Sequence, residues 1–299
     1  MRPTLMIRGR VAQVEGNLVM GVINASPESF SDAGQYDSGE KQRALAASLV
    51  AAGADIIDVG GQSAITNQPE IEADLEIARV LPIVQWLAKH HPDVLVSVDT
   101  YKPPVVKAVL ESGASIINDV SGLQYPEIVD DCARHGAALV LMHTRARPKV
   151  RLQDRDFYAD VADDVVSVLG DLVDQAVAGG MSRESLIVDP GPDFAKTPHQ
   201  TVAVLRRIAD VRALGRPVLL ALSRKDFLGA ITGRSPRGRD AATHAAIAHL
   251  AAVPGNILRV HDVAAARDVV ATIDVLRGVR DLGEDYLLPD AIRHEVRSP

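Results

Sequence analysis

Eight short apolar runs that alternate with longer stretches of helical period constrain the fold more than any other feature of this sequence. The runs are rich in Val, Ile and Leu and are apolar on both faces, which is typical of parallel strands covered by helices. Strict alternation of strand and helix means parallel crossovers, and eight such units favour a closed barrel over an open sheet. The strand-like runs occupy residues 19–24, 56–59, 94–99, 116–118, 138–142, 186–189, 218–223 and 257–260.

Three of the helical stretches end in the same short signal directly before a strand. Glycine in this place supplies the left-handed residue that terminates a helix and turns the chain. The sequence predicts one (β/α)₈ barrel over residues 19–283, a short hairpin over residues 1–18 that caps its bottom, and a polar tail over residues 284–299. The three signals are Ala52-Gly53-Ala54, Ser112-Gly113-Ala114 and His135-Gly136-Ala137.

Composition and charge exclude several classes of protein. Hydrophobic residues make up 47% of the 299 residues, enough for a buried core. The formal net charge of -7 disfavours a nucleic-acid binder. There is a single cysteine, Cys132, and no run of about 18 apolar residues that would indicate a membrane span. We therefore expect a cytoplasmic protein without nucleic-acid or membrane partners.

Polar side chains follow all eight predicted strands, and in a barrel of this kind ligand chemistry gathers at the carboxyl ends of the strands. Asp119 and Asp262 are explained equally well as caps of the next helix. Three others, Asp99, Asn118 and Asp189, together favour a shared ligand. The strand-end residues are Asn24, Asp58, Gln62, Ser63, Asp99, Thr100, Asn118, Asp119, His143, Arg145, Arg147, Asp189, Ser223, Arg224, Lys225, Arg259, His261 and Asp262.

The residue types indicate the chemistry of that ligand. Carboxylates accept hydrogen bonds from ring N–H and amino groups, while Asn and Lys donate to carbonyl oxygens and ring nitrogens, so the set suits a planar heterocycle. Arg259 and His261 are two residues apart on one strand and face the same side; if they face inward, they form a cationic pair suited to a phosphate. The sequence shows no zinc-site spacing and no phosphate-binding glycine loop.

Several of these stretches, in this order, resemble the dihydropteroate synthase family. The resemblance runs from about Met20 to about Arg277, which is nearly the whole chain. The motifs that carry it include Met20-Gly21-Val22-Ile23-Asn24-Ala25-Ser26-Pro27, Ile57-Asp58-Val59-Gly60-Gly61, Ser97-Val98-Asp99-Thr100, Ile117-Asn118-Asp119-Val120-Ser121-Gly122, Asp189-Pro190-Gly191, Ser223-Arg224-Lys225 and Arg259-Val260-His261-Asp262.

The resemblance implies a transferase of folate biosynthesis that condenses dihydropterin-methyl pyrophosphate with p-aminobenzoate, uses Mg²⁺ and forms a homodimer. By the same resemblance, Lys225 and Asp99 are the candidate catalytic residues. The implied binding residues are Asp99, Asn118, Asp189 and Lys225 for the pterin, Asn24 for Mg²⁺ and pyrophosphate, Arg259 and His261 for the anion, and Ser223 near the aminobenzoate.

The loop after the second strand departs from the family pattern. The family reads Gly-Gly-Glu-Ser-Thr-Arg-Pro, whereas this chain reads Gly60-Gly61-Gln62-Ser63-Ala64-Ile65-Thr66, so a hydroxyl and a guanidinium are lost. Each charge-assisted hydrogen bond contributes roughly 1.5–3 kcal/mol, so the loss lowers affinity or rate. Three further positions depart from the family pattern: Ala146 and Asp193 stand where the family has glycine, and Asp226 where it has serine.

Three hypotheses follow. The first is a diverged homologue that retains much of the pterin pocket but condenses its substrates weakly or not at all. The second is an active dihydropteroate synthase in which Arg147 or Lys149 replaces the lost arginine. The third is a non-catalytic protein that binds a pterin or phosphate in an accessory role.

Overall fold

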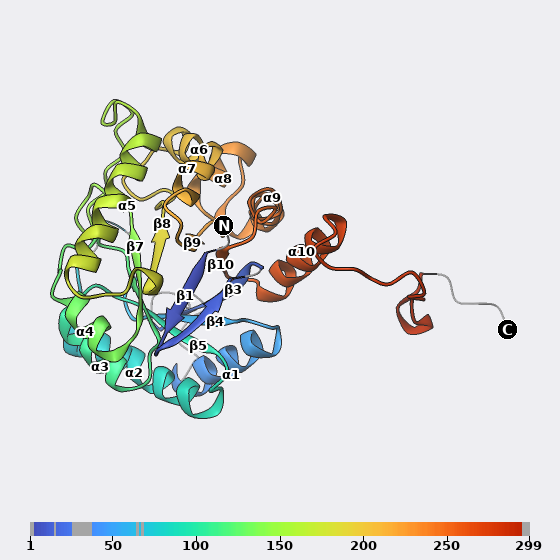
Figure 1. The fold of residues 1–299 in the computed structure, drawn as a ribbon, viewed down its shortest axis with the longest axis horizontal. Coiled ribbons are helices and arrows are strands. Elements are labelled where there is room, and N and C mark those ends of the chain that lie inside the picture. The colour runs from blue at the N-terminus through green and yellow to red at the C-terminus, as the bar shows by residue number, and fades with distance from the viewer. Residues whose placement is uncertain (1–2, 15, 26–37, 64–65, 67–68, 295–299) are drawn as a thin grey trace.

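Eight parallel strands form a closed barrel in the order β10-β3-β4-β5-β6-β7-β8-β9 (Figure 1). The computed structural model describes residues 3–14, 16–25, 38–63, 66 and 69–294. The barrel confirms the predicted fold class. Its strands are β3 (Leu18–Asn24), β4 (Ile56–Gly60), β5 (Leu95–Asp99), β6 (Ile116–Asp119), β7 (Ala138–Met142), β8 (Leu186–Asp189), β9 (Val218–Leu220) and β10 (Asn256–Val260).

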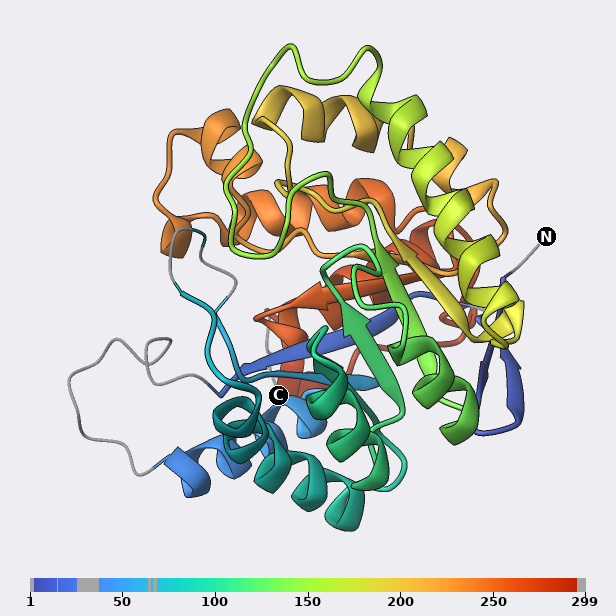
Figure 2. The ribbon, with the colours of Figure 1, turned by 90° about the vertical axis from the view of Figure 1, so that its left-hand side faces the viewer.

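The helices lie outside the strands and cover the barrel (Figure 2). Each buries an apolar face, as α3 does with Val105, Val106 and Val109. The helices are α1 (Ser38–Ala51), α2 (Ala73–His90), α3 (Pro103–Glu111), α4 (Ile128–His135), α5 (Val161–Ala178), α6 (Pro198–Arg206), α7 (Ile208–Arg212), α8 (Asp226–Thr232), α9 (Asp240–Leu250) and α10 (Val263–Leu276), with short 3-10 turns at Arg183–Ser185, Pro236–Gly238 and Asp290–Ile292. None of the described helices is both long and apolar enough to span a membrane.

The repeated helix-ending signal behaves as predicted. Gly53, Gly113 and Gly136 have φ angles of 92°, 111° and 62°, which are accessible to glycine at little cost. A short turn of this kind brings the end of each helix directly to the next strand.

The N-terminal segment forms a hairpin that closes the bottom of the barrel. Its strands β1 (Thr4–Ile7) and β2 (Arg10–Gln13) pair antiparallel. Leu5 and Ile7 pack into a buried cluster with Val14 and with side chains of the barrel strands, including Met20, Ile116 and Ile257. The lower half of the barrel is therefore filled with apolar side chains, and a ligand has room only at the carboxyl ends of the strands.

The seventh barrel strand is shorter than the sequence indicated. It ends at Leu220 instead of residue 223, so Ser223 and Lys225 lie on the following turn. Arg224 has a φ of 60° there, and its backbone N–H donates to Thr243 Oγ1 at 3.1 Å. These contacts end the strand because they direct the chain toward α9 and away from the neighbouring strands.

The chain beyond α10 runs away from the barrel (Figure 1). Nearly all of its described side chains are exposed, large apolar ones among them, such as Leu287 and Ile292.

Candidate functional site

Asp58 on β4 is the centre of a buried polar network at the carboxyl ends of the strands. Its carboxylate accepts hydrogen bonds from Ser97 Oγ at 2.6 Å, Asn118 Nδ2 at 3.2 Å and Arg259 Nε at 2.7 Å. Asp58 is fully buried, and a buried carboxylate persists where it is paired and hydrogen-bonded. Sequence reasoning gave Asp58 no role, although a carboxylate inside an otherwise apolar buried strand was the signal for one.

Asp99 on β5 joins this network through the same arginine. Arg259 NH2 lies 3.0 Å from Asp99 Oδ2, and the strand register places Asp99 opposite Asn118 on β6. Burial raises the pKa of Asp99 to about 7, and the nearby Asp58 carboxylate acts in the same direction while Arg259 opposes it. Asp99 is therefore able to donate or accept a hydrogen bond near neutral pH.

Two side chains of the network offer hydrogen-bonding groups to a ligand. Asn118 Oδ1 is buried and has no hydrogen-bond partner among the described residues. On β8, Asp189 uses Oδ1 to accept from Gly191 N at 2.7 Å, and burial raises its pKa. An unsatisfied buried acceptor costs about 1–3 kcal/mol, so a ligand that donates to Asn118 removes a penalty.

Lys225 lies against an aromatic ring on the adjacent turn. Its Nζ is 4.3 Å from the centre of the Phe194 ring. Burial lowers the pKa of Lys225, while Asp193 and Asp189 act in the opposite direction. Lys225 therefore interacts electrostatically with two other candidate residues, Asp189 and Asp99.

Ser223 and His261 pair with each other at the rim. Ser223 Oγ lies 2.9 Å from His261 Nδ1. Burial and the positive charges of Arg224 and Arg259 lower the pKa of His261 to about 4. At neutral pH His261 is uncharged, so the pair with Arg259, which the sequence indicated as two cations, carries one positive charge.

Asp119 and Asp262, whose roles the sequence left open, both serve the backbone. Asp119 accepts from the N–H groups of Ser121 at 2.8 Å and Leu123 at 2.7 Å. Asp262 accepts from Ala265 N at 3.0 Å at the start of α10. Both carboxylates are occupied by the turns that follow their strands.

Lys196 was missed by sequence reasoning and supports the loop after β8. It is fully buried, and its ammonium donates to the carbonyl oxygens of Gly191 at 3.0 Å and Phe194 at 3.1 Å. It also lies 2.8 Å from His143 Nδ1, whose Nε2 is 2.8 Å from Asp164 Oδ2. Burial lowers the pKa of Lys196 to about 7 and that of His143 to about 3, so His143 is a neutral structural link.

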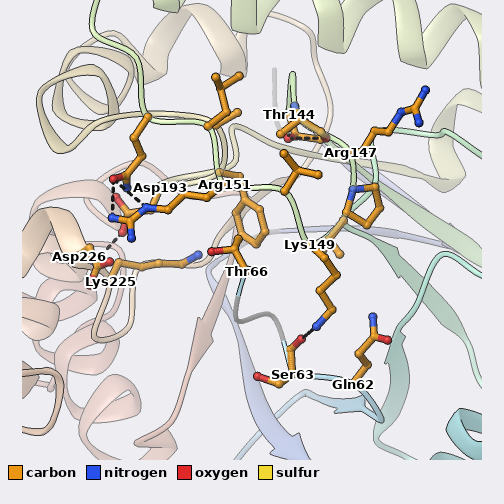
Figure 3. Close-up of a pocket in the computed structure, with 18 of the residues that line it drawn as sticks. Gln62, Ser63, Thr66, Thr144, Arg147, Lys149, Arg151, Asp193, Lys225 and Asp226 are labelled. Atoms are coloured by element: carbon orange, nitrogen blue, oxygen red, sulfur yellow. Dashed lines mark hydrogen bonds between the residues drawn. The ribbon is translucent and has the colours of Figure 1, made fainter. Parts of the chain in front are cut away.

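A cavity of about 450 Å³ opens above the network. The loops that follow β4, β7, β8 and β9 line it, and it includes the candidates Asp99, Ser223 and Lys225 (Figure 3). Its size and its mixture of apolar and polar walls are typical of small-molecule sites.

Two positions that depart from the family pattern lie in the cavity wall. Asp193 has a φ of 65°, which suits the glycine of the family pattern. Its Oδ2 accepts from Asp226 N at 2.6 Å and Phe227 N at 3.3 Å, so the carboxylate caps the first turn of α8. The side chain of Asp226 pairs with Arg239 NH1 at 2.9 Å. Both added carboxylates are therefore engaged within the protein.

A family model described as pterin binding enzyme matches residues 20–261, most of the chain and all eight barrel strands. The chain belongs to this family. The resemblance drawn from the motifs is thereby confirmed.

Curated relatives of this pterin-binding enzyme fall into two groups. A protein of Mycobacterium leprae called inactive dihydropteroate synthase 2 is 38% identical over 280 residues, which cover 92% of this chain and 96% of the relative. A dihydropteroate synthase of Streptococcus pyogenes is also 38% identical over 267 residues, covering 88% and 97%. Sequence identity thus places the chain equally near an inactive and an active relative.

Solved structures agree with the family assignment. A dihydropteroate synthase of Xanthomonas albilineans with 4-aminobenzoic acid has a TM-score of 0.85 and 34% identity, covering 94% of this chain and all of that one. The same enzyme in complex with 7,8-dihydropteroate has a TM-score of 0.82 and 34% identity, covering 93% and 100%.

The Mg²⁺ that the family uses is compatible with Asn24 at the end of β3. Gly60 at the end of β4 lies between Asn24 and Asp99, because a Cβ added there would be 3.9 Å from Asn24 Oδ1 and 3.7 Å from Asp99 Cβ. The described residues contain no group of three His, Cys, Asp or Glu side chains that would hold a metal alone. A single amide oxygen fits Mg²⁺ that takes its other ligands from phosphate and water.

The altered positions Ala64 and Ile65 lie outside the described residues. The residue before them, Ser63, is bonded through its carbonyl oxygen to Lys149 Nζ from the loop after β7. Of the two cations that the sequence offered as substitutes, Lys149 therefore contacts the altered loop directly. Arg147 also lines the cavity, but its side chain extends in a different direction from that of Lys149 (Figure 3).

Proposed function

We propose that this chain is a diverged dihydropteroate synthase homologue that binds a pterin on the strand-end network and condenses it with p-aminobenzoate weakly or not at all. The observation that carries the proposal is a contrast between the strand-end network and the wall of the cavity above it. In the network, Asn118 Oδ1 is buried without a partner among the described residues, so a ligand that donates to it removes a penalty. In the cavity wall, the Asp193 carboxylate already accepts from the backbone N–H of Asp226, beside Lys225.

The pterin is recognised by complementary donors and acceptors. Its amino and ring N–H groups donate to Asp189 and Asn118, and Lys225 donates to its carbonyl oxygen or ring nitrogen. Asp99, with a pKa of about 7, adapts to either role. Phe194, packed against Lys225, holds the ammonium in place.

Condensation needs stabilisation of the departing pyrophosphate. Mg²⁺, when bound with Asn24, supplies a Lewis acid that neutralises phosphate charge. Arg259 is the cation of this chain nearest the network, but its Nε and NH2 are bonded to Asp58 and Asp99. Its charge is therefore shared with two carboxylates and stabilises a leaving anion less than an unpaired guanidinium does.

The second substrate meets a cavity wall with two added carboxylates. Asp193 and Asp226 both line the cavity near Lys225 and weaken the attraction of its cations for the carboxylate of p-aminobenzoate. A weakened attraction for the second substrate and weak stabilisation of the leaving group together predict slow condensation. By family membership we also propose that the protein is a cytoplasmic homodimer.

An active synthase is the second candidate. One observation favours it: Lys149 lies beside the altered loop and donates to the carbonyl oxygen of Ser63. A cation in that place offers a substitute for the arginine of the family pattern.

A binding measurement tests the first part of the proposal, that the strand-end network binds a pterin. Calorimetry with 6-hydroxymethylpterin pyrophosphate and Mg²⁺ should show binding to the wild type. Asp189→Asn preserves the shape but removes the charge, and we expect it to weaken binding by about tenfold to a hundredfold. A wild-type protein that binds no pterin contradicts the proposal, whichever enzyme activity is seen.

The rate of dihydropteroate formation tests the second part of the proposal, that condensation is weak or absent. Dihydropteroate formation should be slow or absent in the wild type and should partly recover in the double variant Ala64→Thr/Ile65→Arg. Normal wild-type turnover would establish the active synthase instead. Pterin binding with no turnover in either protein would place the defect beyond this loop, at Asp193 and Asp226, and would favour an accessory binding role.

A further inference from the structure

The loop between β7 and α5, residues 143–160, lies over the cavity and is attached on both sides of it. Lys149 Nζ donates to the carbonyl oxygen of Ser63 on the loop after β4. On the other side, Tyr158 OH donates to the carbonyl oxygen of Ala195 at 2.8 Å. The positions of the side chains between these attachments are therefore defined by the fold.

Arg151 in this loop, like Arg147, lacks the carboxylate partner that several other arginines near the site have. Its Nε and NH2 both donate to Gln153 Oε1, at 3.2 Å and 2.7 Å, and it forms no ion pair with any described residue. An amide oxygen is neutral, and a guanidinium bonds more strongly to a carboxylate or phosphate than to a neutral acceptor. The neighbouring arginines do have carboxylate partners: Arg145 with Asp164, Arg224 with Asp240, Arg239 with Asp226, and Arg259 with Asp58 and Asp99.

The direction in which the Arg151 side chain extends is a second observation, beside its lack of an ion pair. In Figure 3 Arg151 runs toward Asp193, Asp226 and Lys225, whereas Arg147 extends the other way. Both arginines belong to the same loop, and Arg147 also lacks a carboxylate partner among the described residues. Arg147 is therefore a matched control for the loss of one positive charge from this loop.

The wall of the cavity is more positive than the protein as a whole. Five cationic and three anionic side chains line it, in a chain of net charge -7. Asp193 and Asp226 among the anions are already bonded to backbone amides and to Arg239. A local excess of positive charge in a recess attracts anions.

We propose that Arg151 recognises an oxyanion with two adjacent oxygens, a carboxylate or a phosphate, on the ligand that lies beside the pterin in this cavity. The Nε and NH2 edge that now holds Gln153 would release that amide and bind two oxygens of the anion, an arrangement that matches guanidinium geometry. The inference rests on the proposed function, because the pterin is taken to occupy the strand-end network. It makes Arg151 a residue that determines ligand specificity.

The test compares an acid with its neutral analogue. Equilibrium dialysis would measure 4-aminobenzoate and 4-aminobenzamide binding to the wild type, Arg151→Gln and Arg147→Gln, with inorganic pyrophosphate as a third probe. The wild type should prefer the acid to the amide, or bind pyrophosphate, and Arg151→Gln should weaken that anion by about tenfold or more. Arg147→Gln should keep wild-type affinity.

The outcomes separate the two sources of the oxyanion. A loss confined to 4-aminobenzoate assigns Arg151 to a carboxylate, and a loss confined to pyrophosphate assigns it to a phosphate. Equal losses in both variants, no loss in Arg151→Gln, or no anion binding by the wild type overturns the proposal. Pterin affinity measured in the same three proteins should be unchanged, and a wild type that binds anions but no pterin contradicts the proposed function alone.

Discussion

The site has two parts that are built by different means. The floor is the strand-end network around Asp58, Asp99, Asn118 and Arg259, and the rim is formed by the loops that line the cavity above it. Floor residues such as Asp99 and Asn118 stand near the ends of neighbouring strands, where the barrel register places them side by side. Rim residues such as Arg151 and Asp193 stand on loops, where single contacts to other loops and helices set their positions. A shared register makes the floor hard to change one residue at a time, whereas a loop accepts substitutions singly.

Charge pairing shows the same difference. On the floor, Arg259 is bonded to both Asp58 and Asp99, so removing any of the three leaves a buried charge without its partner. On the rim, the guanidinium of Arg151 bonds to a neutral amide. We expect floor substitutions to alter stability together with binding, and rim substitutions to alter the choice of ligand.

Lys196 supports the loop after β8, which lies between the floor and the rim. Its replacement should give the largest change in stability. Lys196→Met keeps the bulk of the side chain but leaves the buried carbonyl oxygens of Gly191 and Phe194 without their donor, so we expect a loss of about 3 kcal/mol in the free energy of unfolding. Urea denaturation measures it. The exposed Lys107→Met on α3 is the control and should change stability by less than about 0.5 kcal/mol. An equally small change in Lys196→Met would show that the rim loop is held by other contacts.

The stability of the protein should depend on pH through Asp99 on the floor of the site. Its pKa is raised from 3.8 to about 7 on folding, so between these values the native protein holds a proton that the unfolded chain has released. Stability from this group is therefore present at low pH and falls as pH rises toward 7, by roughly 1 kcal/mol per pH unit. Denaturation curves of wild type and Asp99→Asn between pH 4 and 7 check it. The difference between the two proteins should vary with pH, and a constant difference would refute the assignment.

Replacement of Asp193 should give the smallest effect, a change in ligand affinity at the rim with little change in stability. Asp193→Gly removes a carboxylate near Lys225, so 4-aminobenzoate should bind about fivefold more tightly. Stability should change little, because loss of the α8 cap, about 1 kcal/mol, is offset by glycine at a φ of 65°. Asp193→Asn separates charge from conformation and should show the same gain in a dialysis measurement. A gain in glycine but not in asparagine would assign the effect to the backbone.

The sequence predicted the floor better than the rim for a physical reason. Strand periodicity fixes which side chains of a barrel face inward, so Asp99, Asn118 and Asp189 could be grouped without coordinates. Asp58 was overlooked because its partners Ser97 and Arg259 are distant in sequence. The lowered pKa of His261 depends on its burial and its surroundings in the fold, including Arg224 and Arg259, which the sequence alone does not place.

The rim could not be read from the sequence because its contacts join loops of unrelated pattern. Nothing local indicates that Asp193 caps α8 or that Lys149 reaches Ser63. Lys196 lies in a loop of ordinary composition, and its burial depends on the carbonyl oxygens of two separate turns. The direction of Arg151 likewise follows from attachments on either side of its loop.

The hairpin at the bottom of the barrel has a consequence for the order of folding. Leu5 and Ile7 pack with side chains from strands at both ends of the chain, from Met20 on β3 to Ile257 on β10. Contacts of such large sequence separation form slowly, because a long stretch of chain must be ordered before they gain anything. The hairpin is therefore made before every strand that it packs against, yet it reaches its final packing only after β10 has joined the barrel.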